Sequence, residues 1–161
     1  MGGRTPAANF PTRRPVSGGA ATVHAVVAAA ALVAGALVYF AFRPPYLLMF
    51  VWARALDMDG LVEVLRANAA PLRQHLWPWL VYSLPQALWA FSLVSFTVLL
   101  WRRRPGGAST AWLATASFFA LLPEVGQLVG LCAGTFDAVD LGTCIVAVVL
   151  SITLMGRGAI Q

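Results

Sequence analysis

Four long apolar stretches dominate this chain, at residues 21–42, 76–101, 109–131 and 139–155. A helix needs about 20 consecutive apolar residues to cross the hydrocarbon core of a bilayer. The chain is 60% hydrophobic and 11% charged, whereas a soluble domain carries about 25% charged residues. So little charge cannot cover a water-facing surface. The sequence therefore predicts an all-α, polytopic membrane helix bundle with about four transmembrane helices.

The segments before and within these stretches add detail. Residues 1–19 are rich in proline, glycine and small polar residues and lack apolar periodicity, which predicts a disordered tail. Residues 20–157 are expected to form a single membrane domain. The first apolar stretch is longer than a signal-peptide core of about 7–15 residues, so we expect it to stay as a helix. Pro85 should kink the second stretch, because proline removes a backbone donor.

Residues 46–75 are apolar in part but too interrupted to cross a membrane. We expect one or two short helices that lie in the outer interface, with their apolar side toward the lipid. Asp59 is placed to cap the second of these helices. The predicted apolar face of that helix consists of Leu61, Val64, Leu65 and Ala69. The sequence leaves open whether residues 46–56 dip into the bilayer.

The distribution of charge predicts an orientation. All eleven basic residues are arginines. With four spans, seven of them share a side with both termini and the 102–108 loop, and no acidic residue lies there. The other four arginines lie with all six carboxylates. The positive-inside rule makes the first side cytoplasmic. We therefore expect a bacterial cytoplasmic membrane protein with cytoplasmic N- and C-termini, and no nucleic-acid partner despite the net charge of +5.

Two polar residues interrupt the end of the third stretch. Glu124 and Gln127 are three residues apart, so they share a helix face. A charged group at the centre of a bilayer costs about 2.5–3.5 kcal/mol, so such a group is normally turned inward and paired. One interpretation is that Glu124 and Gln127 face a polar pocket. The other is a structural hydrogen bond between helices.

Two aspartates stand where the fourth stretch begins. Asp137 and Asp140 also share a helix face. Asp137 is placed to cap this helix, and Asp140 to interact with the positive end of its dipole. The functional alternative is a cluster of Glu124, Gln127, Asp137 and Asp140 at the outer mouth of the bundle. Such a cluster would bind a cation, accept hydrogen bonds from a sugar or peptide, or act as a general acid–base pair.

The chain carries no complete catalytic motif. There is no GxSxG, HExxH or phosphate-binding glycine loop, so we predict no catalytic residue, no metal site and no cofactor. The two cysteines, Cys132 and Cys144, do not have metal-ligand spacing. They are expected to be small apolar side chains or, alternatively, to form a single disulfide.

Three segments carry a resemblance to the VanZ-like membrane protein family. They are residues 122–127 (LPEVGQ), 134–141 (GTFDAVDL) and 83–92 (SLPQALWAFS). The resemblance covers about residues 45–156 and departs from the family at Gln86, where an acid is usual. It implies a Glu-x-x-Gln pair near the end of one span and an Asp that opens the last. It also implies a link to reduced sensitivity to glycopeptide antibiotics, mainly of the teicoplanin type, without a defined enzymatic reaction.

Three functions remain open from the sequence. The first is a non-enzymatic protein that binds a membrane lipid, or a lipid-linked or glycopeptide ligand, at the outer leaflet. The second is a membrane enzyme that acts on a lipid-linked substrate through Glu124 with Asp137 and Asp140. The third is a small permease subunit or assembly factor in which the polar residues only hold helices together. The sequence does not give the oligomeric state.

Overall fold

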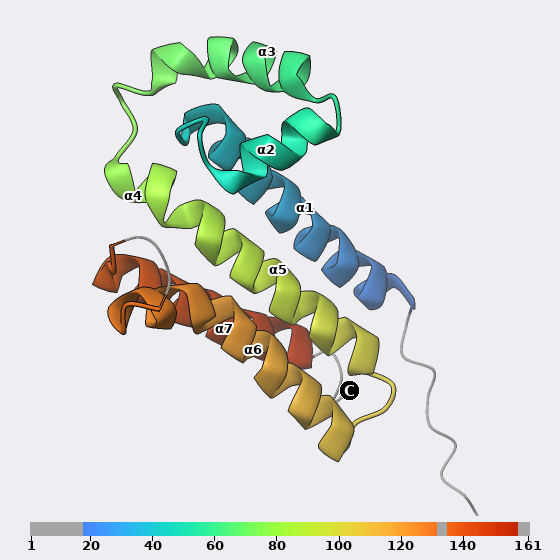
Figure 1. The fold of residues 1–161 in the computed structure, drawn as a ribbon. Helices are drawn as coiled ribbons and strands as arrows, with labels where there is room; N and C mark the ends of the chain where they lie inside the picture. The colour runs from blue at the N-terminus through green and yellow to red at the C-terminus, as the bar shows by residue number, and fades with distance from the viewer. Residues whose placement is uncertain (1–17, 132–134, 158–161) are drawn as a thin grey trace, which may run out of the picture.

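The computed structural model describes residues 18–131 and 135–157, and every regular element within them is helical (Figure 1). The elements are α1 (Gly18–Phe42), α2 (Leu48–Ala55), α3 (Asp59–Ala69), η1 (Ala70–Leu72), α4 (Pro78–Tyr82), α5 (Leu84–Trp101), α6 (Gly107–Leu128) and α7 (Ala138–Arg157). Three segments are long and apolar enough to cross a membrane: Gly19–Phe42, Leu84–Trp101 and Ala138–Met155. The predicted all-α class is confirmed, and the three segments support a multi-pass membrane protein.

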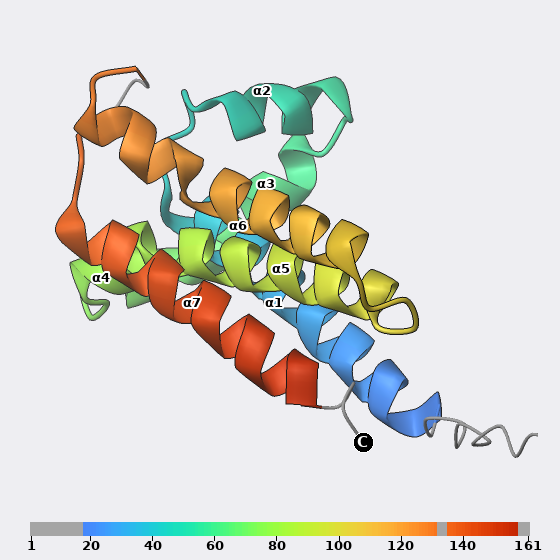
Figure 2. The same cartoon turned by 90° about the horizontal axis from the view of Figure 1, so that it is seen from below.

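Helix α5 is the centre of the arrangement. It packs against α1 on one side and against α6 and α7 on the other. Figures 1 and 2 show α1, α5, α6 and α7 running side by side, with α2 and α3 folded over one end. The beginning of α1, the loop between α5 and α6 and the end of α7 lie at the opposite end. We call these the α2–α3 end and the Arg102 end.

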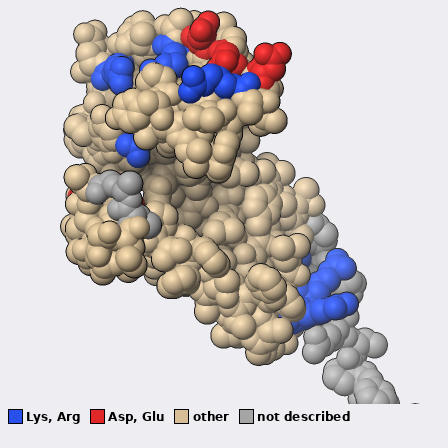
Figure 3. Space-filling view, viewed as in Figure 1, with Lys and Arg blue, Asp and Glu red and all other residues tan. Residues whose placement is uncertain are grey.

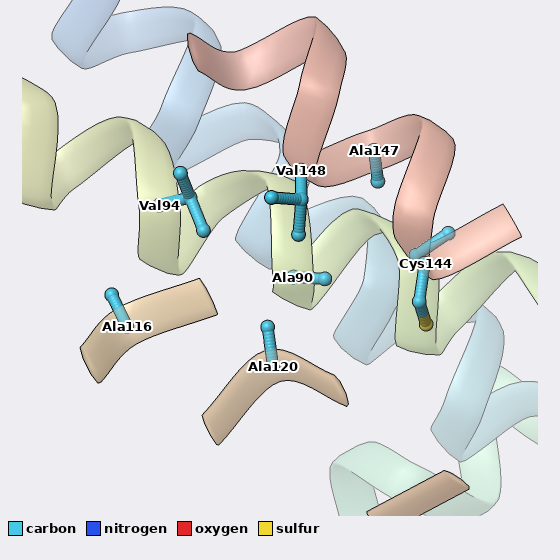
Figure 4. Close-up of a cluster of buried hydrophobic side chains, with 8 residues drawn as sticks. Ala90, Val94, Ala116, Ala120, Cys144, Ala147 and Val148 are labelled. Carbon is cyan, nitrogen blue, oxygen red and sulfur yellow. The ribbon is translucent and has the colours of Figure 1, made fainter. Parts of the chain in front are cut away.

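Small side chains allow α5, α6 and α7 to approach closely. Ala87, Ala90 and Val94 on α5 pack against Ala116 and Ala120 on α6 and against Cys144, Ala147 and Val148 on α7 (Figure 4). In lipid the hydrophobic effect does not drive helices together, because the lipid tails are as apolar as the side chains. Close packing of small residues stabilises helix association instead. A hydrogen bond of 2.9 Å between the buried hydroxyls of Ser95 and Ser151 adds a polar link between α5 and α7.

Two arginines fasten the α2–α3 segment to the end of α1. The Arg66 guanidinium donates hydrogen bonds to the carbonyls of Phe40 (3.1 Å) and Arg43 (2.7 Å). The Arg73 guanidinium donates to the carbonyl of Phe42 at 2.9 Å. The last carbonyls of a helix lack partners within it and carry its negative dipole end. The two guanidinium groups therefore stabilise this end of α1 and hold α3 above it.

The structure corrects one prediction for residues 46–75 and refines another. Asp59 is the first residue of α3 rather than its cap, and it makes no capping hydrogen bond; Met58 occupies the cap position. The buried face of α3 carries Val62 and Ala69, whereas Leu61 and Val64 are more than half exposed. The prediction placed the apolar face of this helix toward the lipid, so the exposure of Leu61 and Val64 agrees with it, whereas Ala69 is instead buried against Phe42 of α1.

The second predicted span is divided. Proline has no N–H for the carbonyl four residues before it, and the helix is interrupted at Ser83, two residues ahead of Pro85. Short α4 ends and α5 begins there, but Ser83 keeps α-helical backbone angles, and the bonds from Ser83 N–H to the Trp79 carbonyl and from Ala87 N–H to the Ser83 carbonyl continue the helical pattern, as expected for the predicted kink. The third predicted span also ends early, because α6 stops at Leu128 and Gly130 has a positive φ of 73°.

At the N-terminus, Gly18 and Gly19 belong to α1 rather than to the predicted tail, and the rest of that tail lies outside the described residues.

Charged residues gather at the two ends. The exposed carboxylates of the α2–α3 segment lie at one end beside several arginines, and arginines alone lie at the other (Figure 3). Between them the surface has few charges and exposes many valines and leucines, among them Val26 and Val33 on α1 and Val146 and Leu154 on α7. An uncharged apolar band between charged ends is the surface that a bilayer requires.

Candidate functional site

Glu124 is the most buried ionisable residue of the predicted cluster. It lies one turn before the end of α6, and only 4% of its surface is exposed. Its Oε2 atom is buried and accepts no hydrogen bond from the described residues. A buried carboxylate oxygen without a donor costs free energy, so such groups in native proteins need an explanation, for example an ion, a water molecule or a ligand.

Asp140 is held by a residue that lies far away in the sequence. It stands in the first turn of α7 and is partly buried. The Ser83 hydroxyl, at the junction of α4 and α5, donates a hydrogen bond to Oδ1 of Asp140. The Thr143 hydroxyl donates to the backbone carbonyl of Asp140 at 2.9 Å. The kink before Pro85 thus places the buried Ser83 hydroxyl against the start of α7.

Asp137 caps α7, as predicted. Its Oδ1 atom accepts a hydrogen bond from the backbone N–H of Val139 at 2.8 Å. This is the usual capping geometry, in which a side-chain oxygen satisfies a free N–H in the first turn. Asp137 is exposed, in contrast to Glu124.

The charges converge at the α2–α3 end. The Glu124 carboxylate interacts electrostatically with Asp140 and Asp137 of α7 and with Arg43, which follows α1. The Arg43 guanidinium lies over the rings of Tyr39 (5.7 Å) and Tyr82 (5.1 Å), and its Nε atom is buried without a hydrogen bond among the described residues. We call Glu124, Asp137 and Asp140 the carboxylate cluster. Arg43 is the cation that acts on it.

Gln127 is less closely connected to the carboxylate cluster. It lies one turn after Glu124 and is partly buried. No hydrogen bond joins it to the cluster within the described ranges.

The described carboxylates do not form a metal site. Among residues 18–131 and 135–157, no group of three His, Cys, Asp or Glu side chains is placed to hold an ion. Of the two cysteines, Cys144 is fully buried in α7. Cys132 lies outside the described residues, so their pairing stays an open prediction.

Two residues of the site were missed by sequence reasoning. Arg43 was treated only as a flanking charge, although its place after the aromatic end of the first apolar stretch is the signal for cation–π contacts. Ser83 was not singled out, although a hydroxyl two residues before a proline within a membrane span is a ready hydrogen-bond donor. Its partner Asp140 follows only from the fold.

Comparison with known proteins gave no match for this chain among protein-family profiles, curated proteins or solved structures.

Proposed function

We propose that this chain is a VanZ-like membrane protein with four spans that binds a lipid or lipid-linked molecule at the outer leaflet through the carboxylate cluster. The observation that carries the proposal is the buried Glu124 with its unpartnered Oε2 atom. The segments that carry the resemblance support it as well. Ser83, in the segment 83–92, donates a hydrogen bond to Asp140, in the segment 134–141, although 57 positions separate them.

The fourth span in this proposal is α6. Its 22 residues give a length of about 33 Å at 1.5 Å per residue, and a bilayer core is about 30 Å thick. Helix α6 packs between the same two ends as α5 and α7 (Figure 2). Its serines, threonines, Glu124 and Gln127 lower its apolar character relative to the other three. Polar residues of this kind are tolerated within a span where they face neighbouring helices.

The charge of the cluster indicates the chemistry of its ligand. Three carboxylates stand against one guanidinium, and a buried carboxylate oxygen requires a donor. A head group with an ammonium or hydroxyl donor would satisfy Glu124. The same head group would use an anionic phosphate to reach the buried Nε atom of Arg43. Phosphatidylethanolamine has both groups, and a glycosylated lipid has hydroxyl donors.

A binding role is favoured over catalysis by what the aspartates already do. Asp137 caps α7, and Asp140 is bonded to Ser83. A general acid–base pair needs a second group that is free to exchange a proton with the substrate. Of the three, Glu124 is the one with a buried oxygen that accepts no hydrogen bond from the described residues.

The test is lipid selectivity of the full chain. The purified protein in detergent is titrated with phosphatidylethanolamine, a glucosyl diacylglycerol and phosphatidic acid, and bound lipid is counted by native mass spectrometry. We expect the first two to be retained over phosphatidic acid. Glu124→Gln should reduce that preference about tenfold, equivalent to about 1.4 kcal/mol. Glu63→Gln, which changes an exposed carboxylate on α3, is the matched control. Equal retention of all three lipids by the unmodified chain would reject the proposal.

A cellular measurement complements the binding assay. We expect Glu124→Gln to change sensitivity to a teicoplanin-type antibiotic at constant protein abundance, measured in cells that express the full chain. Glu63→Gln should leave sensitivity unchanged.

A further inference from the structure

A groove of about 480 Å³ runs between α5 and α7. Its walls include Ala87, Leu88 and Phe91 on α5 and Val139, Val146 and Leu150 on α7. Its volume lies within the range of about 300–1,000 Å³ typical of ligand pockets. Both walls belong to segments that are long and apolar enough to cross a membrane. The groove therefore opens where the hydrocarbon core of a bilayer would be.

The groove begins beside the carboxylate cluster. Val139 and Thr143 line the groove near the start of α7, on either side of Asp140 in the sequence. The Thr143 hydroxyl donates a hydrogen bond to the Asp140 backbone carbonyl. Ala87, on the opposite wall, lies one turn after Ser83, the hydrogen-bond donor to Asp140. A molecule in the groove would therefore have an apolar part along α5 and α7 and a polar part at Asp140.

The length of the groove matches one leaflet. It follows α7 from Val139 to Leu150, which is about 16 Å at 1.5 Å per residue. Half of a hydrocarbon core of about 30 Å is about 15 Å. An acyl chain that begins at the cluster would thus end near the middle of the bilayer, where Leu150 lies. A helix from another protein would instead continue through both leaflets.

We infer that the groove holds one acyl chain of a lipid whose head group is bound at the carboxylate cluster. The inference rests on the proposed function and narrows it, because it makes the ligand a lipid of the leaflet at the α2–α3 end. Van der Waals contacts of the acyl chain with Phe91, Val146 and Leu150 contribute to the binding affinity, and the carboxylate cluster determines which head group is preferred.

Gly142 offers a substitution that fills the groove without damaging the helix. It lines the groove, and a Cβ atom added there meets no atom within 4 Å. Gly142→Leu therefore places a side chain in open space and also raises helix propensity. Val146→Trp is a second variant that narrows the groove from an exposed position. Val149→Phe adds bulk at an exposed position of α7 that is not among the residues lining the groove, and is the matched control.

The experiment uses phosphatidylethanolamine with a diazirine in the middle of one acyl chain. The full chain is reconstituted in nanodiscs of phosphatidylethanolamine and phosphatidylglycerol with a trace of this probe, irradiated, and mapped by mass spectrometry of peptic fragments. We expect cross-links to concentrate in residues 87–91 and 139–150. Gly142→Leu and Val146→Trp should lower this labelling about fivefold, equivalent to about 1 kcal/mol. Val149→Phe should not change it.

The outcomes separate the groove from the head-group site. The inference is overturned if the exposed face of α1 and the part of α7 outside the groove are labelled as strongly as the groove residues. It is also overturned if both groove variants leave the labelling unchanged. Occupation of the groove by a second copy, seen as a dimer in native mass spectrometry together with no lipid adducts at residues 139–150, also overturns it. Groove labelling with no lipid preference at Glu124 supports the groove and rejects only the proposed head-group site. Lipid preference at Glu124 without groove labelling supports the head-group site and rejects the acyl-chain groove.

Discussion

Ser83 donates a hydrogen bond to the Asp140 carboxylate, which ties the α4–α5 junction to the first turn of α7. Ser83 is 2% exposed, so water does not compete strongly for its hydroxyl. The bond also determines which oxygen atoms of the cluster are free. With Asp140 bonded to Ser83 and Asp137 used as a cap, Glu124 is the carboxylate with a free buried oxygen.

Loss of this bond should destabilise the bundle. A hydrogen bond to a charged group contributes about 1.5–3 kcal/mol, and Ser83→Ala removes the donor while Asp140 stays in place. We expect the free energy of unfolding in detergent to fall by about 1–3 kcal/mol for Ser83→Ala and for Asp140→Ala alike. The double variant should lose little more than either single one. Strictly additive losses, within about 0.5 kcal/mol, would contradict a direct interaction.

Arg66 should be essential for the position of the α2–α3 segment. Arg66→Ala leaves the carbonyls of Phe40 and Arg43 without their donor. We expect a loss of about 1.5–3 kcal/mol and faster amide hydrogen exchange in α3. Arg54→Ala is the matched control, because among the described residues the Arg54 Nε atom donates within its own helix, to the Phe50 carbonyl at 3.4 Å. Equal exchange rates in the two variants would mean that Arg66 does not hold α3.

Gly35 lies where α1 packs tightly against α5. A Cβ atom there would lie 2.7 Å from Trp89 Nε1 and 3.1 Å from the Pro85 carbonyl oxygen. The indole would have to move, and the backbone oxygen cannot move easily. Gly35→Ala should therefore cost about 1–3 kcal/mol, as overpacking usually does. Gly142→Ala has open space and should be neutral or stabilising by up to about 1 kcal/mol. Thermal unfolding of both variants in the same detergent tests the difference, and a neutral Gly35→Ala would contradict the packing.

The helical class could be predicted because apolar stretches of about 20 residues permit few structures in a bilayer. Asp137 as a cap was also predictable, since capping depends on neighbouring residues alone. The grouping of Glu124 with Asp140 was predictable because one residue lies near the end of α6 and the other at the start of α7, and a short connection joins these two helix ends.

The remaining features depend on tertiary placement. Arg66 bonds to carbonyls more than 20 positions away, and no local pattern specifies that distance. The same arginine helps to set which face of α3 packs on α1, so Val62 and Ala69 are buried there while Leu61 and Val64 stay exposed.

The proposed crossing of α6 is the part of the topology that most affects the proposed function, because it would place the carboxylate cluster and the Arg102 end on opposite sides of the membrane. Single cysteines at Arg103, Thr135 and Glu63, in a chain without Cys132 and Cys144, are probed with a membrane-impermeant maleimide. If α6 crosses, Thr135→Cys and Glu63→Cys react from the outside of intact cells, and Arg103→Cys reacts only after lysis.

A re-entrant α6 gives a different pattern, in which Thr135→Cys behaves like Arg103→Cys. That pattern would leave three crossings and place Asp137 on the side of the arginine loop. It is opposed by the packing of α6 along α5 through Ala116 and Ala120. It is also opposed by the start of α7 beside Ser83, because the α4–α5 junction lies at the α2–α3 end. We therefore expect Thr135→Cys and Glu63→Cys to be labelled together.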